Sequence, residues 1–84
     1  MQIYKIEFEK SAQKFIDKQD KAQRLRLYKA IYKLPEGQDI KKLAGYNLYR
    51  LRVGKYRVIY SVDNGKYTIY IIDVGNRGQI YNQY

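Results

Sequence analysis

Residues 48–73 alternate between apolar and polar side chains, and this alternation constrains the fold more than any other feature. Within residues 49–53, for example, a tyrosine, a leucine and a valine alternate with two arginines. A period of two is typical of strands with one buried face. Gly54-Lys55 suits a two-residue type II′ turn, and Asn64-Gly65 suits a type I′ turn. The segment is therefore predicted to form three antiparallel strands joined by two tight hairpins.

Two-residue turns also predict which residues stand opposite one another in neighbouring strands. Because side chains alternate between the two faces of a strand, the same count predicts which side chains share a face. Across the first turn, the predicted pairs are Val53 with Tyr56, Arg52 with Arg57, Leu51 with Val58 and Arg50 with Ile59. Across the second turn, the predicted pairs are Ile59 with Tyr70 and Arg57 with Ile72.

The predicted register gathers arginines on one face of the sheet. Arg52 and Arg57 stand directly opposite each other, with Arg50 two residues along the strand. Like charges in direct cross-strand pairing destabilise a sheet by roughly 0.2–1 kcal/mol. An anionic ligand would offset this cost, because guanidinium groups bind phosphate with two parallel hydrogen bonds. The alternative is a solvated face whose arginines serve only solubility.

Charge and composition favour an anionic partner and exclude several kinds of site. The 84 residues fit one domain, residues 1–84, with a net charge of +9. The chain has no cysteine and no histidine, so thiolate and imidazole metal sites and histidine-based catalysis are excluded. We find no apolar run of membrane-spanning length and no signal-peptide core, and we expect a cytoplasmic protein without a membrane partner. Between Asp39 and Asp63 all charged residues are basic, namely Lys41, Lys42, Arg50, Arg52, Lys55 and Arg57.

The remaining chain predicts one strand and two helices. Residues 2–8 alternate like a strand, with Tyr4, Ile6 and Phe8 on the covered face. Ala12, Phe15 and Ile16 then follow helical spacing. Asp20 and Gln23 form a capping box that begins a second helix, and Pro35-Glu36-Gly37 ends it. The apolar side of the second helix is predicted to comprise Leu27, Ala30, Ile31 and Leu34, widened by Leu25, Tyr28 and Tyr32.

These elements predict an α+β fold: one strand, a two-helix hairpin, then a three-stranded antiparallel meander. Helices packed on one face of a small sheet would supply the core. Residues 38–47 are predicted to be a connection anchored by Ile40 and Leu43. The last strand, residues 67–74, is apolar on both faces, which is typical of a central strand. The order of the strands stays open.

The element order and two motifs resemble the RelE/ParE superfamily of bacterial type II toxins. The motifs are residues 49–60, YRLRVGKYRVIY, and residues 74–81, VGNRGQIY. The resemblance implies a toxin held inactive by a cognate acidic antitoxin. In the RelE-like branch it implies a ribosome-dependent endonuclease that cleaves mRNA in the A site. The ribose 2′-oxygen attacks the adjacent phosphate, without a metal or other cofactor.

The resemblance also implies roles for individual residues. Arg57 matches the strand arginine that stabilises the phosphate. Arg77 matches an arginine that contacts phosphate and protonates the leaving group. Tyr81 matches a tyrosine that orients the nucleophile or base. Arg50 and Arg52 stand where the prototype usually has lysine, and an arginine is a poor general base. Tyr81 could act as the base, the ribosome could orient the nucleophile, or activity could be weak. The predicted RNA-binding residues are Arg50, Arg52, Lys55, Tyr70, Lys41 and Lys42, with Tyr70 placed to stack on a base.

Two other functions fit the same sequence. One is a ParE-like inhibitor of DNA gyrase, because a shared fold does not fix function. The other is an inactive homologue whose arginines only bind nucleic acid, with salt-sensitive binding and no cleavage. For the antitoxin, we expect a segment that is disordered when free and that folds over the helix hairpin or the basic sheet face.

Overall fold

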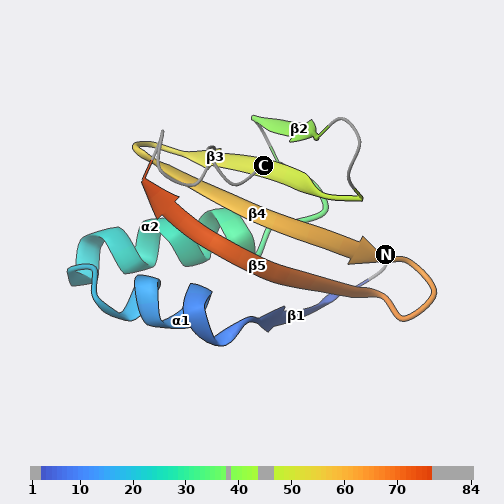
Figure 1. Ribbon diagram of the computed structural model, residues 1–84, viewed down its shortest axis with the longest axis horizontal. Coiled ribbons are helices and arrows are strands. Elements are labelled where there is room, and N and C mark those ends of the chain that lie inside the picture. Colours follow the sequence, from blue (N-terminus) through green and yellow to red (C-terminus); the bar gives the residue numbers. More distant parts are fainter. Residues whose placement is uncertain (1–2, 38, 44–46, 77–84) are drawn as a thin grey trace.

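Five strands and two helices succeed one another along the part of the chain that the structure describes (Figure 1). The computed structural model describes residues 3–37, 39–43 and 47–76. The elements are β1 Lys5–Phe8, α1 Lys10–Asp17, α2 Lys21–Ile31, β2 Ile40–Lys42, β3 Tyr49–Val53, β4 Tyr56–Asp63 and β5 Thr68–Asn76.

The strands form a single sheet in the order β1-β5-β4-β3-β2. β1 runs parallel to β5, and the other neighbours are antiparallel. Both helices lie on the same side of this sheet (Figure 1). The α+β arrangement and the interior position of β5 are therefore confirmed. β2 was not predicted, since it spans only three residues of the expected connection at 38–47.

The helix hairpin begins and packs largely as the sequence predicts. The Asp20 Oδ1 atom accepts a hydrogen bond of 3.0 Å from the backbone N–H of Gln23, at the start of α2. Two side chains predicted to be buried are exposed, however: Leu25 by 59% and Tyr32 by 61%. Leu25 lies two residues before Leu27, about 200° away around the helix, so it points to the opposite side. Tyr32 follows the last residue of α2.

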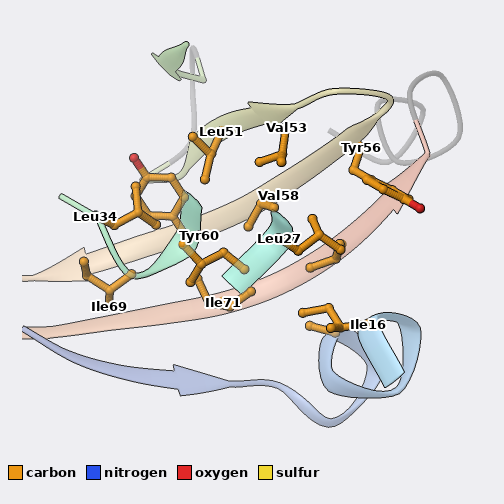
Figure 2. Packing of buried hydrophobic residues seen from close by; sticks show 13 residues of the cluster. Ile16, Leu27, Leu34, Leu51, Val53, Tyr56, Val58, Tyr60, Ile69 and Ile71 are labelled. Carbon is orange, nitrogen blue, oxygen red and sulfur yellow. The ribbon is translucent and has the colours of Figure 1, made fainter. Parts of the chain in front are cut away.

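The main core lies between the helices and the sheet (Figure 2). The rings of Tyr49 and Tyr60 stack within it, with centroids 5.4 Å apart. The Tyr56 hydroxyl donates to Gln19 Oε1 at 2.9 Å, so this buried ring keeps a polar partner. The buried members of the core are Ala12, Ile16, Leu27, Ile31, Leu34, Leu51, Val53, Tyr56, Val58, Tyr60, Ile69, Ile71 and Val74.

The first hairpin has the predicted turn and register. Gly54 has φ +57°, whereas Lys55 has no positive φ, as a type II′ turn requires. The observed pairs include Val53 with Tyr56 and Arg52 with Arg57. Leu51 also pairs with Val58 and Arg50 with Ile59, so all four predicted pairs are confirmed.

The second hairpin differs from the prediction. Neither Asn64 nor Gly65 has the positive φ of a type I′ turn, and Tyr67 carries it instead, at 48°. Asp63 pairs with Thr68, and its Oδ1 accepts from the Lys66 backbone N–H at 3.2 Å, so the loop has two more residues than predicted.

A β-bulge then displaces the register by one further residue. The register shifts between Ile59 and Tyr60, where Tyr60 pairs with Ile71 but Ile59 pairs with Asp73. The predicted pairs of Ile59 with Tyr70 and of Arg57 with Ile72 are therefore wrong. Arg57 pairs with Gly75.

Candidate nucleic-acid interface

Three arginines share the sheet face opposite the helices. Leu51 and Val58, which alternate with these arginines, belong to the core on the helix side. Arg50 and Arg52 on β3 and Arg57 on β4 therefore point to the other side, which we call the arginine face. The sequence prediction of this cluster is confirmed by the register.

The arginine face is ordered in rows that cross the strands. One row contains Arg52, Arg57 and Gly75. The next row contains Lys41, Arg50, Ile59 and Asp73. Cα atoms of directly opposed antiparallel residues lie about 4.5–5.5 Å apart, so the two rows form a compact set of charged groups around one apolar residue.

Burial distinguishes the three arginines. Arg57 is 4% exposed and Arg50 is 7% exposed, whereas Arg52 is half-buried. Removing a guanidinium from water costs free energy that anionic or hydrogen-bonding partners offset. Arg52 Nε is buried and has no hydrogen-bond partner among the described residues.

A small apolar cluster occupies the centre of the arginine face. Ile59 is fully buried there and packs with Leu43 and Leu48. Leu43 is thus an anchor of the segment before β3, as predicted, while the other anchor, Ile40, packs against the main core. Along β4, Ile59 lies between Arg57 and Ser61, so it separates Arg57 from Tyr70, which pairs with Ser61.

The other predicted RNA-binding residues are distributed more widely. Lys41 pairs with Arg50 and shares its face, but Lys42 pairs with Tyr49, which belongs to the helix side. Lys55 lies in the first turn, with its Nζ atom 5.4 Å from the centroid of the Tyr56 ring.

Tyr70 lies on the arginine face but not at its predicted position. It pairs with Ser61 and not with Ile59, because the second loop has two more residues than predicted. Tyr70 is therefore one row farther from Arg57 than the sequence predicted. Arg77 and Tyr81, the remaining predicted catalytic residues, lie outside the described residues.

Asp73 is a candidate that sequence reasoning missed. Its side chain is partly buried on the arginine face, in the row of Arg50 and Ile59. Burial raises the pKa of Asp73, while a hydrogen bond from the Val74 backbone acts in the opposite direction. A single charged residue within an apolar strand was the available signal, but only the bulge shows which face it occupies.

Two hollows on the surface differ in their relation to the arginine cluster: one lies apart from it, and the other is lined in part by Arg52, a member of the cluster. One is lined by Tyr4, Ile6, Tyr32 and Leu34, on the helix side near β1. A second, at the β2–β3 edge, is lined in part by Asp39 and Arg52.

No helix of the described chain is both long and apolar enough to cross a membrane.

Comparison with known families gives one clear match. The family model described as the ParE toxin of the type II toxin-antitoxin system, parDE, matches residues 6–81. The comparison with curated proteins gave no match.

Solved structures of toxin–antitoxin complexes share the fold. The archaeal RelE–RelB complex from Pyrococcus horikoshii OT3 contains a chain 32% identical, with 93% of this chain and 99% of that chain covered and a TM-score of 0.76. The RelB–RelE complex from Methanococcus jannaschii gives 32% identity, coverage of 93% and 98%, and a TM-score of 0.74. The intact E. coli RelBE complex gives 28% identity, coverage of 90% and 99%, and a TM-score of 0.73.

Proposed function

The chain belongs to the ParE toxin family of type II toxin–antitoxin systems, within the RelE/ParE superfamily, and on this premise we propose that it is a ribosome-dependent mRNA endonuclease. The observation that supports this activity best is the arginine cluster, in which Arg52 directly opposes Arg57 and Arg50 shares their face. Directly opposed arginines destabilise a sheet when no ligand is bound. A phosphate bound across them would offset this cost, because each guanidinium can donate hydrogen bonds to it.

The proposed reaction needs charge stabilisation and positioning more than covalent catalysis. The 2′-oxygen attacks the adjacent phosphorus, the bond to the 5′-oxygen breaks, and negative charge develops on the phosphate oxygens. Arg57 is proposed to stabilise this charge, Arg77 to contact the phosphate and protonate the leaving oxygen, and Tyr81 to orient the nucleophile or base. Preorganised guanidinium groups are suited to such a transition state.

Binding of mRNA is proposed to use the basic residues around the cluster. Arg50, Arg52 and Lys41 share the arginine face, and Lys55 extends the positive charge to the first turn. Since Arg57 is only 4% exposed, the groups packed over it must shift when a phosphate binds. The proposal therefore includes a local rearrangement of this face on the ribosome.

A cognate antitoxin is the expected partner when the toxin is inactive. The P. horikoshii, M. jannaschii and E. coli structures are each complexes of RelE with RelB. The net charge of +9 favours a net acidic antitoxin segment, folding over the helix hairpin or the arginine face on contact.

The test is to map 5′ ends on a short mRNA after the purified protein is added to programmed ribosomes. We expect cuts in the A-site codon that require ribosomes. Arg57→Ala should lower the cleavage rate on the order of 10²–10³-fold, the usual cost of losing one preorganised donor. Arg57→Lys keeps the charge but loses the planar fork, so it should not restore full activity.

The matched control is Lys29→Ala, which removes one positive charge from an exposed position on α2, on the helix side of the sheet. Circular dichroism of each variant checks that the fold is retained. Full cleavage by a folded Arg57→Ala variant would contradict the proposal.

Inhibition of DNA gyrase is the second candidate, favoured by the family model, which describes a ParE toxin. A supercoiling assay with purified gyrase and excess toxin distinguishes the two functions. Loss of supercoiling without any mRNA cleavage would replace the first proposal by the second.

A further inference from the structure

The proposed cleavage reaction requires a group that accepts the proton of the 2′-hydroxyl. Arg50 and Arg52 cannot serve as this group, because a guanidinium carries hydrogen-bond donors and no acceptor. The chain has no histidine. Among the described residues, a proton acceptor on the arginine face is therefore a carboxylate, a tyrosine or a lysine.

The bulge places a carboxylate there. In a regular strand, residue 73 would share the face of Ile69 and Ile71, both fully buried in the main core. The register shift puts Asp73 opposite Ile59, on the arginine face, and returns Val74 to the core. One extra residue in β5 thus brings a charged side chain out of the core and onto the face with the arginines.

Asp73 is a close neighbour of the proposed phosphate site. Arg57 pairs with Gly75, two residues along β5, so Asp73 and Arg57 are diagonal neighbours with Cα atoms about 7–8 Å apart. Because glycine has no side chain, none projects from β5 directly opposite Arg57. A phosphate held by Arg57 would therefore have Asp73 as its nearest charged neighbour on β5.

Other charged groups face Asp73 from each neighbouring strand. Arg57 faces it diagonally from β4, and Arg50 lies in the same row on β3, with Ile59 between them. Lys41 ends this row on β2, and Glu7 on β1 pairs with Tyr70, three residues before Asp73. Burial keeps the pKa of Asp73 above its ordinary value, and a carboxylate with a raised pKa is a stronger base when ionised.

We propose that Asp73 is the general base of the cleavage reaction, an assignment that rests on the proposed endonuclease function. The Asp73 carboxylate accepts the 2′-hydroxyl proton as the bond between the 2′-oxygen and phosphorus forms. The bond between phosphorus and the 5′-oxygen breaks, and the leaving oxygen takes up a proton, the role proposed for Arg77. The products are a 2′,3′-cyclic phosphate and a 5′-hydroxyl. Asp73 then releases its proton to water, and Arg77 takes up a proton from water.

The test compares Asp73→Asn with wild type in single-turnover cleavage on programmed ribosomes, over a pH range that extends from the ordinary aspartate pKa of about 4 to about pH 8. The wild-type rate should rise with pH as Asp73 ionises, and Asp73→Asn should be slower by roughly 100-fold or more and lose this rise. Binding of the RNA should stay equal or become tighter, because a negative charge leaves the phosphate site. A purely structural role would not remove the pH dependence while preserving RNA binding.

Two further variants make the test specific. Glu7→Gln changes a carboxylate to an amide on the same sheet face but on the edge strand β1, and it should cleave like wild type. Asp73→Glu retains the carboxylate and should recover part of the rate and the pH dependence. If Asp73→Asn does not fold, Asp73→Ser is measured in its place.

The outcomes separate the two proposals. If wild type cleaves and a folded Asp73→Asn variant cleaves at the same rate with the same pH profile, the assignment of Asp73 is overturned and the endonuclease function stands. If wild type does not cleave mRNA on ribosomes, the proposed function fails and the assignment of Asp73 fails with it.

Discussion

Tyr60 should make the fold sensitive to alkaline pH. Its side chain is 1% exposed, and its ring stacks on Tyr49 at an angle of 19°. Burial raises the pKa of Tyr60 from 10.0 to about 12, with a smaller contribution from charge repulsion by Tyr49. The folded state thus favours the neutral hydroxyl, whereas the unfolded state releases its proton near the ordinary value.

The sign and size of the effect follow from proton linkage. The stabilisation is complete below the unfolded pKa of about 10 and is lost as pH rises through about 12. At pH 11, midway between the two, the free energy of unfolding should have decreased by ~1.4 kcal/mol through Tyr60. Tyr60→Phe keeps the ring but has no proton to release, so it should lack this part of the decrease.

The assay is urea denaturation followed by circular dichroism, at pH 8 and pH 11, for wild type and Tyr60→Phe. Ionisation of tyrosines and lysines that are distant from Tyr60 is common to both proteins and cancels in the difference. Tyr67→Phe serves as the matched control, since Tyr67 is 46% exposed and should behave like wild type. An equal loss of stability in wild type and Tyr60→Phe between the two pH values would refute the reasoning.

Two substitutions test the packing by urea denaturation at neutral pH. Leu27→Ala removes a fully buried side chain and should lower the free energy of unfolding by about 2–5 kcal/mol, whereas Leu25→Ala, at a site 59% exposed, should change it little. Gly54→Ala places a Cβ atom at φ +57° and 3.3 Å from Arg26 Cζ, so we expect a loss of about 1–2 kcal/mol. Unchanged stability in Leu27→Ala or Gly54→Ala would contradict the packing or the turn geometry described above.

Sequence reasoning predicted best where local chemistry decides the structure. Gly54 alone needs a positive φ in the first turn, and the alternation beside it specifies the faces of β3 and β4. The arginine cluster followed directly from that register. Asp20 likewise marks the start of α2, because its side chain satisfies a backbone N–H there.

The errors arose where interactions beyond the local pattern decide the structure. The Asn64-Gly65 signal predicted a short turn, but Asp63 accepts from Lys66 and the Asn64 side chain accepts from the Tyr4 hydroxyl at 2.7 Å. Three-residue β2 carries too little periodicity to be detected. The position of Asp73 depends on a bulge, which has no signature in the alternation of an apolar strand.

The bulge also sets different length constraints on neighbouring parts of the chain. In the loop between Asp63 and Thr68, adding or removing two residues can preserve which side chains face the helices, because strand faces repeat every two residues. Removal of a single residue near Ile72 would instead exchange the two faces from Asp73 onward, placing a carboxylate in the core and Val74 outside. Natural and engineered variation in chain length can therefore be accommodated at the tip of this hairpin, while the interior of β5 permits almost none.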